Sequence, residues 1–410
     1  MRSLFSAYKN SFSNIQRNIW VLAISMFINR SGSMVLLFAS LYFTHDLHFS
    51  FAQAGVVMSF YGMGSICGSY LGGWLTDRKN LGHIMMASLA GSGIILLCLL
   101  LTSNPVLISV IIFFYALVAD IFRPANSKAT AQYSDPDNLT RSVSLIRLAI
   151  NLGFSVGPAA GGFIALYFGY KWLFAIDSVT SIGAAVMLWF YLPRIPHEKK
   201  SSAIEKQKPK SLSAYKDVSY LLFIILVSLY AICFFQIFAS VPQYFSKECN
   251  YSSNTIGLLL ALNGFLVVVI EMPFITMLEK NKRIFRYIIM GTLCLPVCFS
   301  MLLFGHNLMV AAIFYTVIIT FSEIFAMPFM MKYVLSKPEA DRQGQYAALY
   351  SIAYGIANIC APLLGLGIAD RYGFEVMFYF FIVVSICVAI SFYFLAMRNR
   401  KILLTASLES

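Results

Sequence analysis

Residues 18–44 read NIWVLAISMFINRSGSMVLLFASLYFT, a run of mostly apolar side chains with one permanent charge, Arg30. The run is 27 residues long, and a helix needs roughly 20 mainly apolar residues to cross the hydrocarbon core of a bilayer. The stretch therefore predicts a membrane-crossing helix that carries a cation near its middle.

The whole chain has the composition of an integral membrane protein. Of its 410 residues, 59% are hydrophobic and 12% are charged, whereas soluble domains carry about 25% charged residues. Eleven further apolar runs follow the first, so we predict an all-α integral membrane protein with twelve transmembrane helices. The predicted spans are 18–44, 51–76, 83–102, 106–129, 142–167, 171–193, 218–245, 254–278, 286–304, 308–333, 344–369 and 373–397.

Lys and Arg residues are distributed unequally between the loops that join these spans. With both termini placed in the cytoplasm, 24 of the 30 Lys and Arg residues lie on the cytoplasmic side, and only Lys171, Lys247 and Arg371 lie outside. The other three, Arg30, Arg123 and Arg147, lie within spans. Cytoplasmic loops of membrane proteins carry an excess of these residues. The bias predicts cytoplasmic termini, and it accounts for the formal net charge of +12 without a nucleic-acid partner.

An internal repeat indicates two pseudo-symmetric six-helix bundles. Pro124 and Pro158 recur 204 residues later as Pro328 and Pro362, and glycine and aromatic residues follow at matching offsets. A polar, Lys-rich linker separates the two bundles. The predicted parts are an N-terminal bundle at 1–193, a cytoplasmic linker at 194–217, a C-terminal bundle at 218–397 and a cytoplasmic tail at 398–410.

Two motifs carry a resemblance to a known family. Residues 151–162 read NLGFSVGPAAGG, similar to the G-x-x-x-G-P-x-x-G-G motif of antiporters, and residues 72–83 read GGWLTDRKNLGH, similar to a G-x-x-x-D-R/K-x-G-R/K-R/K loop. The chain resembles the major facilitator superfamily over essentially its whole length, and the 12-helix drug:proton antiporter branch in particular. The matching positions are Gly153, Gly157, Pro158, Gly161 and Gly162 in the first motif and Gly73, Asp77 and Arg78 in the second.

The resemblance implies the major facilitator fold, with spans 1, 4, 7 and 10 around a central substrate cavity. Each of these spans carries a polar group near mid-depth: Arg30, Asp120, Gln236 and Glu323. Arg123 loosely matches the arginine that antiporters carry on the fourth helix. By the same resemblance, Asp77 contacts the start of span 11 and closes the inner side of the transporter.

Charged groups inside a membrane are candidates for function because a charge at the bilayer centre costs roughly 2.5–3.5 kcal/mol on insertion scales. A carboxyl that binds either a proton or a cationic ligand is the minimal machinery of proton antiport. We expect Arg30 to face Asp120, either as part of that machinery or as a static packing contact. Glu271 is a second protonation candidate, or pairs with Lys280 or Arg283 near the inner surface.

The sequence lacks the residue patterns of nucleotide-binding and metal-binding proteins. It contains no phosphate-binding GxxxxGK[ST] loop, and no His, Cys or carboxylate residues at the spacing of a metal site. We expect no enzyme activity, no metal and no cofactor, with the proton gradient as the energy source.

Asp177, about six residues into the sixth span, is expected to anchor the outer end of its helix.

The leading hypothesis is a proton-coupled secondary transporter in a bacterial inner (plasma) membrane that exports lipophilic small molecules, cationic ones included, by alternating access. Aromatic and Met residues on spans 1, 7 and 10 suit such guests. The alternative is a carrier for one defined metabolite, such as a siderophore or amino acid. In either case we expect a monomer whose partners are a small-molecule substrate, protons and the lipid bilayer.

Overall fold

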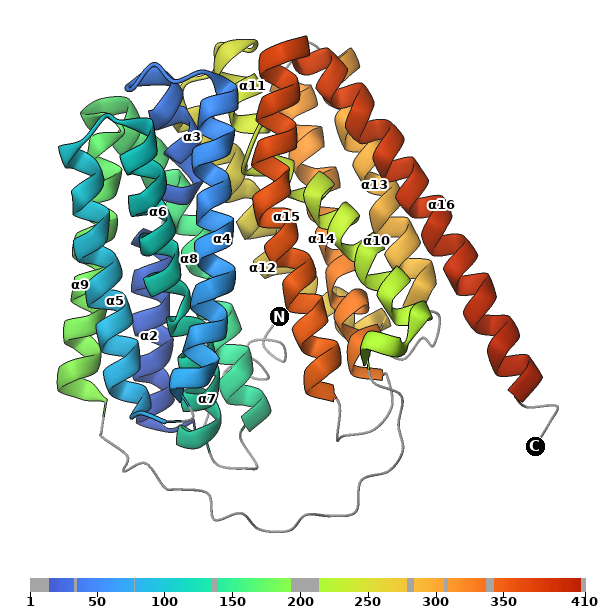
Figure 1. Ribbon diagram of the computed structural model, residues 1–410, viewed down its shortest axis with the longest axis horizontal. Helices are drawn as coiled ribbons and strands as arrows, with labels where there is room; N and C mark the ends of the chain where they lie inside the picture. The colour runs from blue at the N-terminus through green and yellow to red at the C-terminus, as the bar shows by residue number, and fades with distance from the viewer. Residues whose placement is uncertain are drawn as a thin grey trace, which may run out of the picture. The chain divides into compact units, whose positions relative to one another are not determined.

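The computed structural model contains helices and no strands in the part of the chain that it describes (Figure 1). That part comprises residues 15–32, 35–76, 78–134, 139–192, 214–278, 284–305, 309–336 and 343–406.

The N-terminal elements follow the first six predicted spans closely, and one of them, α4, has the predicted bounds. They are α2 (Arg17–Gly32), α3 (Val35–His45), α4 (Phe51–Thr76), α5 (Leu81–Cys98), η1 (Leu99–Leu101), α6 (Pro105–Asp120), α7 (Phe122–Tyr133), α8 (Leu139–Phe168) and α9 (Lys171–Tyr191).

The C-terminal elements follow the last six predicted spans in the same way. They are η3 (Ala214–Lys216), α10 (Val218–Phe234), η4 (Phe235–Ile237), α11 (Val241–Lys247), α12 (Ser253–Leu278), α13 (Ile284–Phe304), α14 (Met309–Ser336), α15 (Gln343–Tyr372) and α16 (Phe374–Ala406).

Capping side chains set several helix starts. Asn80 and Asn104 accept hydrogen bonds from backbone N–H groups in the first turns of α5 and α6, and Asp217 does the same for α10. These N–H groups have no partner inside their own helices, so a capping oxygen satisfies them where the chain enters the membrane.

Proline explains the interruption of the fourth predicted span. α6 ends at Asp120 and α7 begins at Phe122, and Pro124 follows within the first turn of α7. Proline has no N–H to donate to the carbonyl four residues earlier, which here belongs to Asp120. The local break therefore falls at the residue whose carboxylate was predicted to be functional.

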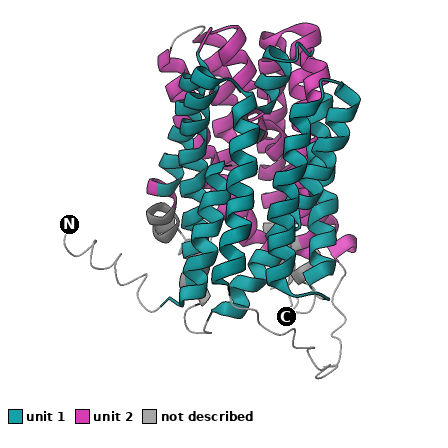
Figure 2. Cartoon of the chain, turned by 90° about the vertical axis from the view of Figure 1, so that its left-hand side faces the viewer, with its two compact units in different colours: residues 1–49, 56–199, 252–268 teal, residues 50–55, 200–251, 269–410 magenta. Residues whose placement is uncertain are grey.

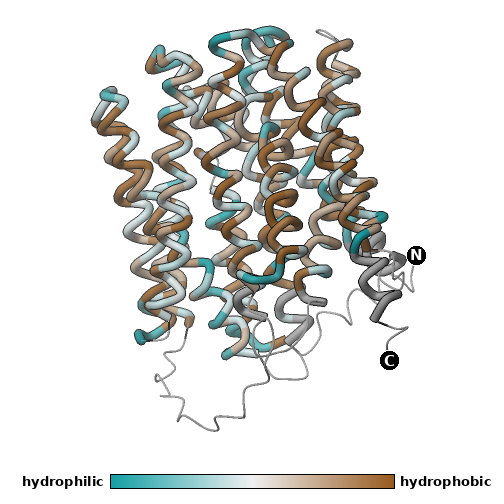
Figure 3. The backbone as a smooth tube through the Cα atoms, turned by 45° about the vertical axis from the view of Figure 1, so that its right-hand side comes forward, coloured by the Kyte–Doolittle hydropathy of each residue, from teal (hydrophilic) through white to brown (hydrophobic). Residues whose placement is uncertain are grey.

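Ten helical segments among the described residues are long and apolar enough to cross a membrane. The first two predicted spans fall outside that set. α2 and α3 are only 16 and 11 residues long, and the apolar character of α4 is diluted by glycine and serine. Figure 3 shows hydrophobic residues along the middle of the helices and hydrophilic residues gathered toward their ends.

Two compact units divide the chain, and Figure 2 colours them separately. Unit 1 contains residues 1–49, 56–199 and 252–268, so it takes in the first part of α12. Unit 2 contains residues 50–55, 200–251 and 269–410. The predicted division of the chain at the linker stays a prediction.

Glycines let helices of unit 1 approach closely. Gly64 and Gly68 of α4 lie against the backbone carbonyls of Phe113 and Leu117 on α6, where a Cβ on either glycine would overlap those oxygens. Lipid tails are as apolar as leucine side chains, so helix association in a membrane relies on such close van der Waals packing.

The antiporter-type motif supplies a similar surface on α8. Gly153 and Gly157 face the α2 backbone at Arg30 and Ser31, and a Cβ on Gly153 would lie 2.5 Å from the Arg30 Cβ. The position of Arg30 therefore depends on the absence of a side chain at Gly153.

The next turn of α8 packs on the part of α12 that belongs to unit 1. A Cβ on Gly162 would lie 2.6 Å from the carbonyl oxygen of Ser253, and Gly257 lies against the carbonyl of Pro158. One motif thus packs against α2 through its first glycines and against α12 through its last.

We predict that Gly153→Ala destabilises the protein, whereas Gly183→Ala does not. Overpacking of a filled interface costs about 1–3 kcal/mol, and a Cβ at Gly183 on α9 would meet no atom within 4 Å. Thermal unfolding of the two purified variants in detergent makes the comparison. Equal midpoints for the two variants would contradict the packing described for α2 and α8.

Candidate functional site

Asp120 is held by a cation from its own chain segment. The Arg123 Nε lies 2.8 Å from Asp120 Oδ1, and the Ser65 hydroxyl of α4 donates a hydrogen bond to Oδ2. The Asp120 side chain is 4% exposed and that of Arg123 is 51% exposed. The carboxylate is therefore neutralised at the break between α6 and α7 by a cation whose side chain is half-exposed.

Arg30 has no direct ion pair among the described residues. Its guanidinium lies 5.5 Å from the centre of the Phe154 ring of α8, and its buried Nε has no hydrogen-bond acceptor among the described residues. The direct ion pair of Asp120 is with Arg123, while the charge of Asp120 also acts on Arg30. The expected facing of Arg30 and Asp120 is therefore electrostatic, without a direct ion pair between them. A cation–π contact with Phe154 takes the place of a direct carboxylate contact.

In unit 2, Glu323 lies near the middle of α14, where it is half-buried among tyrosines. Its charge acts on Tyr230 of α10 and Tyr354 of α15. The Tyr230 hydroxyl lies 3.1 Å from the hydroxyl of Ser322, and the Tyr350 hydroxyl donates to Tyr354 at 3.2 Å. Tyrosines of α10 and α15 therefore lie within electrostatic range of the predicted carboxylate.

Gln236 is fully buried in η4, and its amide joins two helices of unit 2. Its Nε2 donates to the carbonyls of Ile232 at 3.0 Å and Ala361 at 3.1 Å, and its Oε1 accepts from Ser240 at 2.6 Å. Gly365 leaves room for this amide. These contacts hold η4 against α15, and a role of Gln236 in substrate binding stays a prediction.

Glu271 on α12 is buried, with 9% of its surface exposed. The basic residues proposed as its partners, Lys280 and Arg283, lie outside the described residues, so that alternative stays open.

The loop motif after α4 is described in part. Asp77, the predicted gating residue, lies outside the described residues. Arg78 stacks its guanidinium 4.0 Å from the centre of the Trp74 ring, and Gly73 faces open space. The Lys128 ammonium of α7 donates to the carbonyl of Thr76 at 2.8 Å, where a cation complements the negative end of the α4 dipole.

All five matching residues of the antiporter-type motif are buried on α8. Gly153, Gly157, Pro158 and Gly162 make the contacts with α2 and α12 described above, and Gly161 is buried beside them. The geometry gives this motif a packing role within unit 1.

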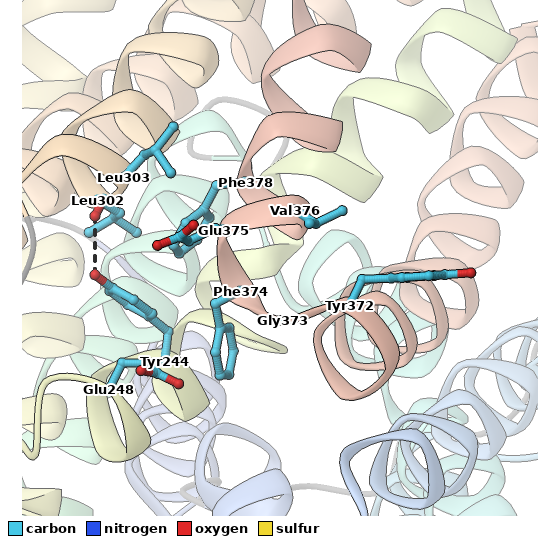
Figure 4. A pocket seen from close by; sticks show the side chains of 10 residues that line it. All are labelled: Tyr244, Glu248, Leu302, Leu303, Tyr372, Gly373, Phe374, Glu375, Val376 and Phe378. Atoms are coloured by element: carbon cyan, nitrogen blue, oxygen red, sulfur yellow. Dashed lines mark hydrogen bonds between the residues drawn. The ribbon is translucent and has the colours of Figure 1, made fainter.

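Figure 4 shows a pocket in unit 2 that contains none of the predicted residues. The Tyr244 hydroxyl donates to the Leu302 carbonyl at 3.1 Å across one side of it. The lining residues are Tyr244, Glu248, Leu302, Leu303, Tyr372, Gly373, Phe374, Glu375, Val376 and Phe378.

The sequence reasoning missed the neutral partners of the two carboxylates. Ser65 stands between the recurring glycines Gly64 and Gly68, so its place near the face that meets α6 was the available signal. Tyr230 and Tyr354 carried no comparable signal, because tyrosines are frequent throughout this chain.

A family model described as Major Facilitator Superfamily matches residues 22–359, which are most of the chain. The chain belongs to the major facilitator superfamily. It is accordingly a multi-pass membrane protein and a transporter, as its sequence predicts.

Two relatives of this transporter match along most of their length at low identity, and a third matches over less than half. The MFS-type transporter YqjV of Bacillus subtilis is 22% identical over 391 residues, which are 93% of each chain. Multidrug resistance protein 2 of the same organism is 24% identical over 378 residues, or 86% of this chain and 89% of that protein. The cis,cis-muconate transport protein of Acinetobacter baylyi is 23% identical over 189 residues, or 45% and 46%.

Solved transporter structures share the fold. The peptide transporter POT in complex with sulfate gives a TM-score of 0.79 at 16% identity and covers 95% of this chain and 96% of that one. A mutant of the nucleoside transporter NupG gives 0.78 at 13% identity, with coverages of 92% and 100%. At these identities the likeness shows the fold alone, and it confirms the predicted major facilitator fold of twelve transmembrane helices.

We predict that Arg123→Gln destabilises this transporter more than Arg30→Gln. Loss of one partner of a buried ion pair costs about 3–5 kcal/mol, and exposure of Arg123 to water should reduce this to about 1–3 kcal/mol. Arg30→Gln removes a cation that has no ion pair among the described residues, so its loss should be smaller. Thermal unfolding in detergent compares the two, and a larger loss in Arg30→Gln would contradict the pairing.

Proposed function

We propose that this member of the superfamily is a proton-coupled secondary transporter that exports lipophilic small molecules, cationic ones included, across the plasma membrane by alternating access. The observation that carries the proposal is Glu323, a half-buried carboxylate near the middle of a membrane-crossing helix whose charge acts on Tyr230 and Tyr354. An ionised group is costly at that depth, so a proton or a cationic ligand that neutralises it is strongly favoured. Exchange of one for the other links substrate movement to proton movement.

Aromatic side chains near this carboxylate support the proposed substrate class. The Phe235 ring of η4 lies 5.9 Å from that of Tyr354, and the Phe321 and Phe325 rings of α14 lie 6.2 Å apart on either side of Glu323 in sequence. Ring faces attract cations and accept flat apolar guests of varied shape. The similarity to a multidrug resistance protein is consistent with such guests.

A second candidate is a carrier for one defined metabolite, such as a siderophore or amino acid. Arg30 favours it, because a guanidinium without an ion pair among the described residues suits an anionic or zwitterionic solute. The similarity to a muconate transport protein is in keeping with a substrate of that charge.

The test follows the pH inside inside-out vesicles whose lumen has been acidified, with a pH-sensitive dye as the reporter. Lipophilic cations and zwitterionic metabolites are added one at a time. Proton antiport predicts that a substrate releases protons from the lumen, and that Glu323→Gln reduces this release to the level of vesicles without the protein. The matched control is Glu375→Gln, which removes an exposed carboxylate at the start of α16.

Each outcome assigns the function differently. Release caused only by zwitterionic or anionic metabolites would favour the second candidate. Release that persists in Glu323→Gln would remove Glu323 from the coupling role and transfer it to Asp120 or Glu271. Wild-type vesicles that respond to no compound, with folded protein present, would contradict proton-coupled export of broad specificity.

A further inference from the structure

Asp177 is a buried carboxylate that the proposed function does not use. It lies on α9 with 1% of its surface exposed. The Ser181 hydroxyl, one turn further along, donates to its Oδ1 at 3.3 Å, while the buried Oδ2 has no hydrogen-bond partner in the described part of the chain. The sequence predicts that Asp177 anchors the outer end of its helix, but the hydrogen bond to its Oδ1 comes from Ser181 of the same helix and not from a group at the helix end.

A hydrogen-bond relay reaches the carboxyl from α2. The Asn29 amide donates to the Ser181 hydroxyl at 3.2 Å, so the hydroxyl proton of Ser181 is directed to Asp177. Asn29 immediately precedes Arg30, and the two helices are tightly packed there, because Gly32 lies against the side chain of Thr180. A movement of α2 at Arg30 would therefore also move Asn29, whose hydrogen bond to Ser181 orients the donor to Asp177.

Few titratable groups face this carboxyl. Arg30 of α2 acts on Asp177 through its charge, and Tyr115 of α6 acts on it through a side-chain hydrogen bond. The charge of Asp177 in turn acts on Tyr61 of α4. The other helices packed on α9, which are α3, α5 and α8, bring no charged side chain that acts on it within the described residues. Arg30 is thus the cation available to Asp177.

Neither the Asp177 carboxyl nor the Arg30 guanidinium has a direct ion pair among the described residues, and the two groups can carry opposite charges. An ionised Asp177 would have only neutral hydroxyls, those of Ser181 and Tyr115, and no direct ion pair within the described part of the chain, which is unfavourable for a buried carboxylate. With a proton on Oδ2 the group is neutral, which removes the cost of burying an unpaired charge. Arg30 has a ring face and, in the part of the chain that the structure describes, no acceptor for its Nε. A carboxylate formed at Asp177 would give Arg30 a second anion beside Asp120, whose charge already acts on it.

We propose that the Asp177 carboxyl is a second proton-binding site of this transporter, and that Arg30 becomes its partner when the proton leaves. The step releases one proton to water and converts a neutral acid into a carboxylate beside a fixed cation. This inference rests on the proton-coupled transport proposed above. It assigns to unit 1 a proton site separate from Asp120, whose carboxylate is already paired.

The test is infrared difference spectroscopy of the purified protein between acid and alkaline buffer, in which each carboxyl that loses a proton gives its own carbonyl-stretch band. We expect one such band to be absent in Asp177→Asn. Ser181→Ala keeps the carboxyl and removes its hydrogen-bond donor, so the same band should shift in frequency. Asp46→Asn, which changes a carboxyl in the loop after α3, should leave the band unchanged.

A flux measurement then decides whether the proton takes part in transport. In acidified vesicles, Asp177→Asn should lose substrate-triggered proton release and retain substrate exchange in the absence of a gradient. An unchanged set of bands in Asp177→Asn would overturn the proposal, and so would a lost band with full proton release. If wild type itself releases no protons, the proposed function fails, while the spectra still show whether Asp177 holds a proton.

Discussion

Arg30 keeps its positive charge at any pH that a cell meets, yet its helix packs within a bundle that lipid surrounds. α8 meets this constraint with Gly153 and Gly157, which bring its backbone against α2 at Arg30, and with the Phe154 ring beside the guanidinium. The motif that resembles those of antiporters therefore serves, within unit 1, as the packing surface for this cation. Its last residues pack on α12, so one short stretch of α8 contacts helices from the first and the second half of the sequence.

The buried carboxylates differ in which neighbours balance their charge. A carboxylate with a fixed partner has a structural role, whereas one without such a partner can exchange a bound proton or ligand. Asp120 has Arg123 and the Ser65 hydroxyl, so its charge is compensated within unit 1. Asp177 has one long hydrogen bond from Ser181 and an oxygen with no partner in the described residues. The charge of Glu323 in unit 2 acts on two tyrosines. A carboxyl that can exchange a bound proton for a substrate can link the movement of protons to the movement of substrate.

Much of the fold could be predicted from the sequence, because lipid imposes a minimum length on every apolar span. α4 has the predicted bounds, and α9 begins at the predicted Lys171. The partners of the charged groups could not be predicted in this way. Whether Asp120 meets Arg30 or Arg123 depends on the rotation of helices and on a break at Pro124, and neither is visible in hydropathy. Asp177 lies near the end of its span by residue count, but its burial is set by the packing of α2 and α5 against α9.

The most direct test of proton exchange as the driving force is the steady-state accumulation of a labelled lipophilic cation in proteoliposomes, measured as the imposed pH difference is increased stepwise. Potassium and valinomycin clamp the membrane potential, and liposomes without the protein correct for passive uptake. Proton antiport predicts that accumulation in an acidic lumen rises with each step of the pH difference and disappears when a proton ionophore is added. Accumulation that stays at the equilibrium ratio at every pH difference, with active exchange of the same compound, would contradict proton coupling.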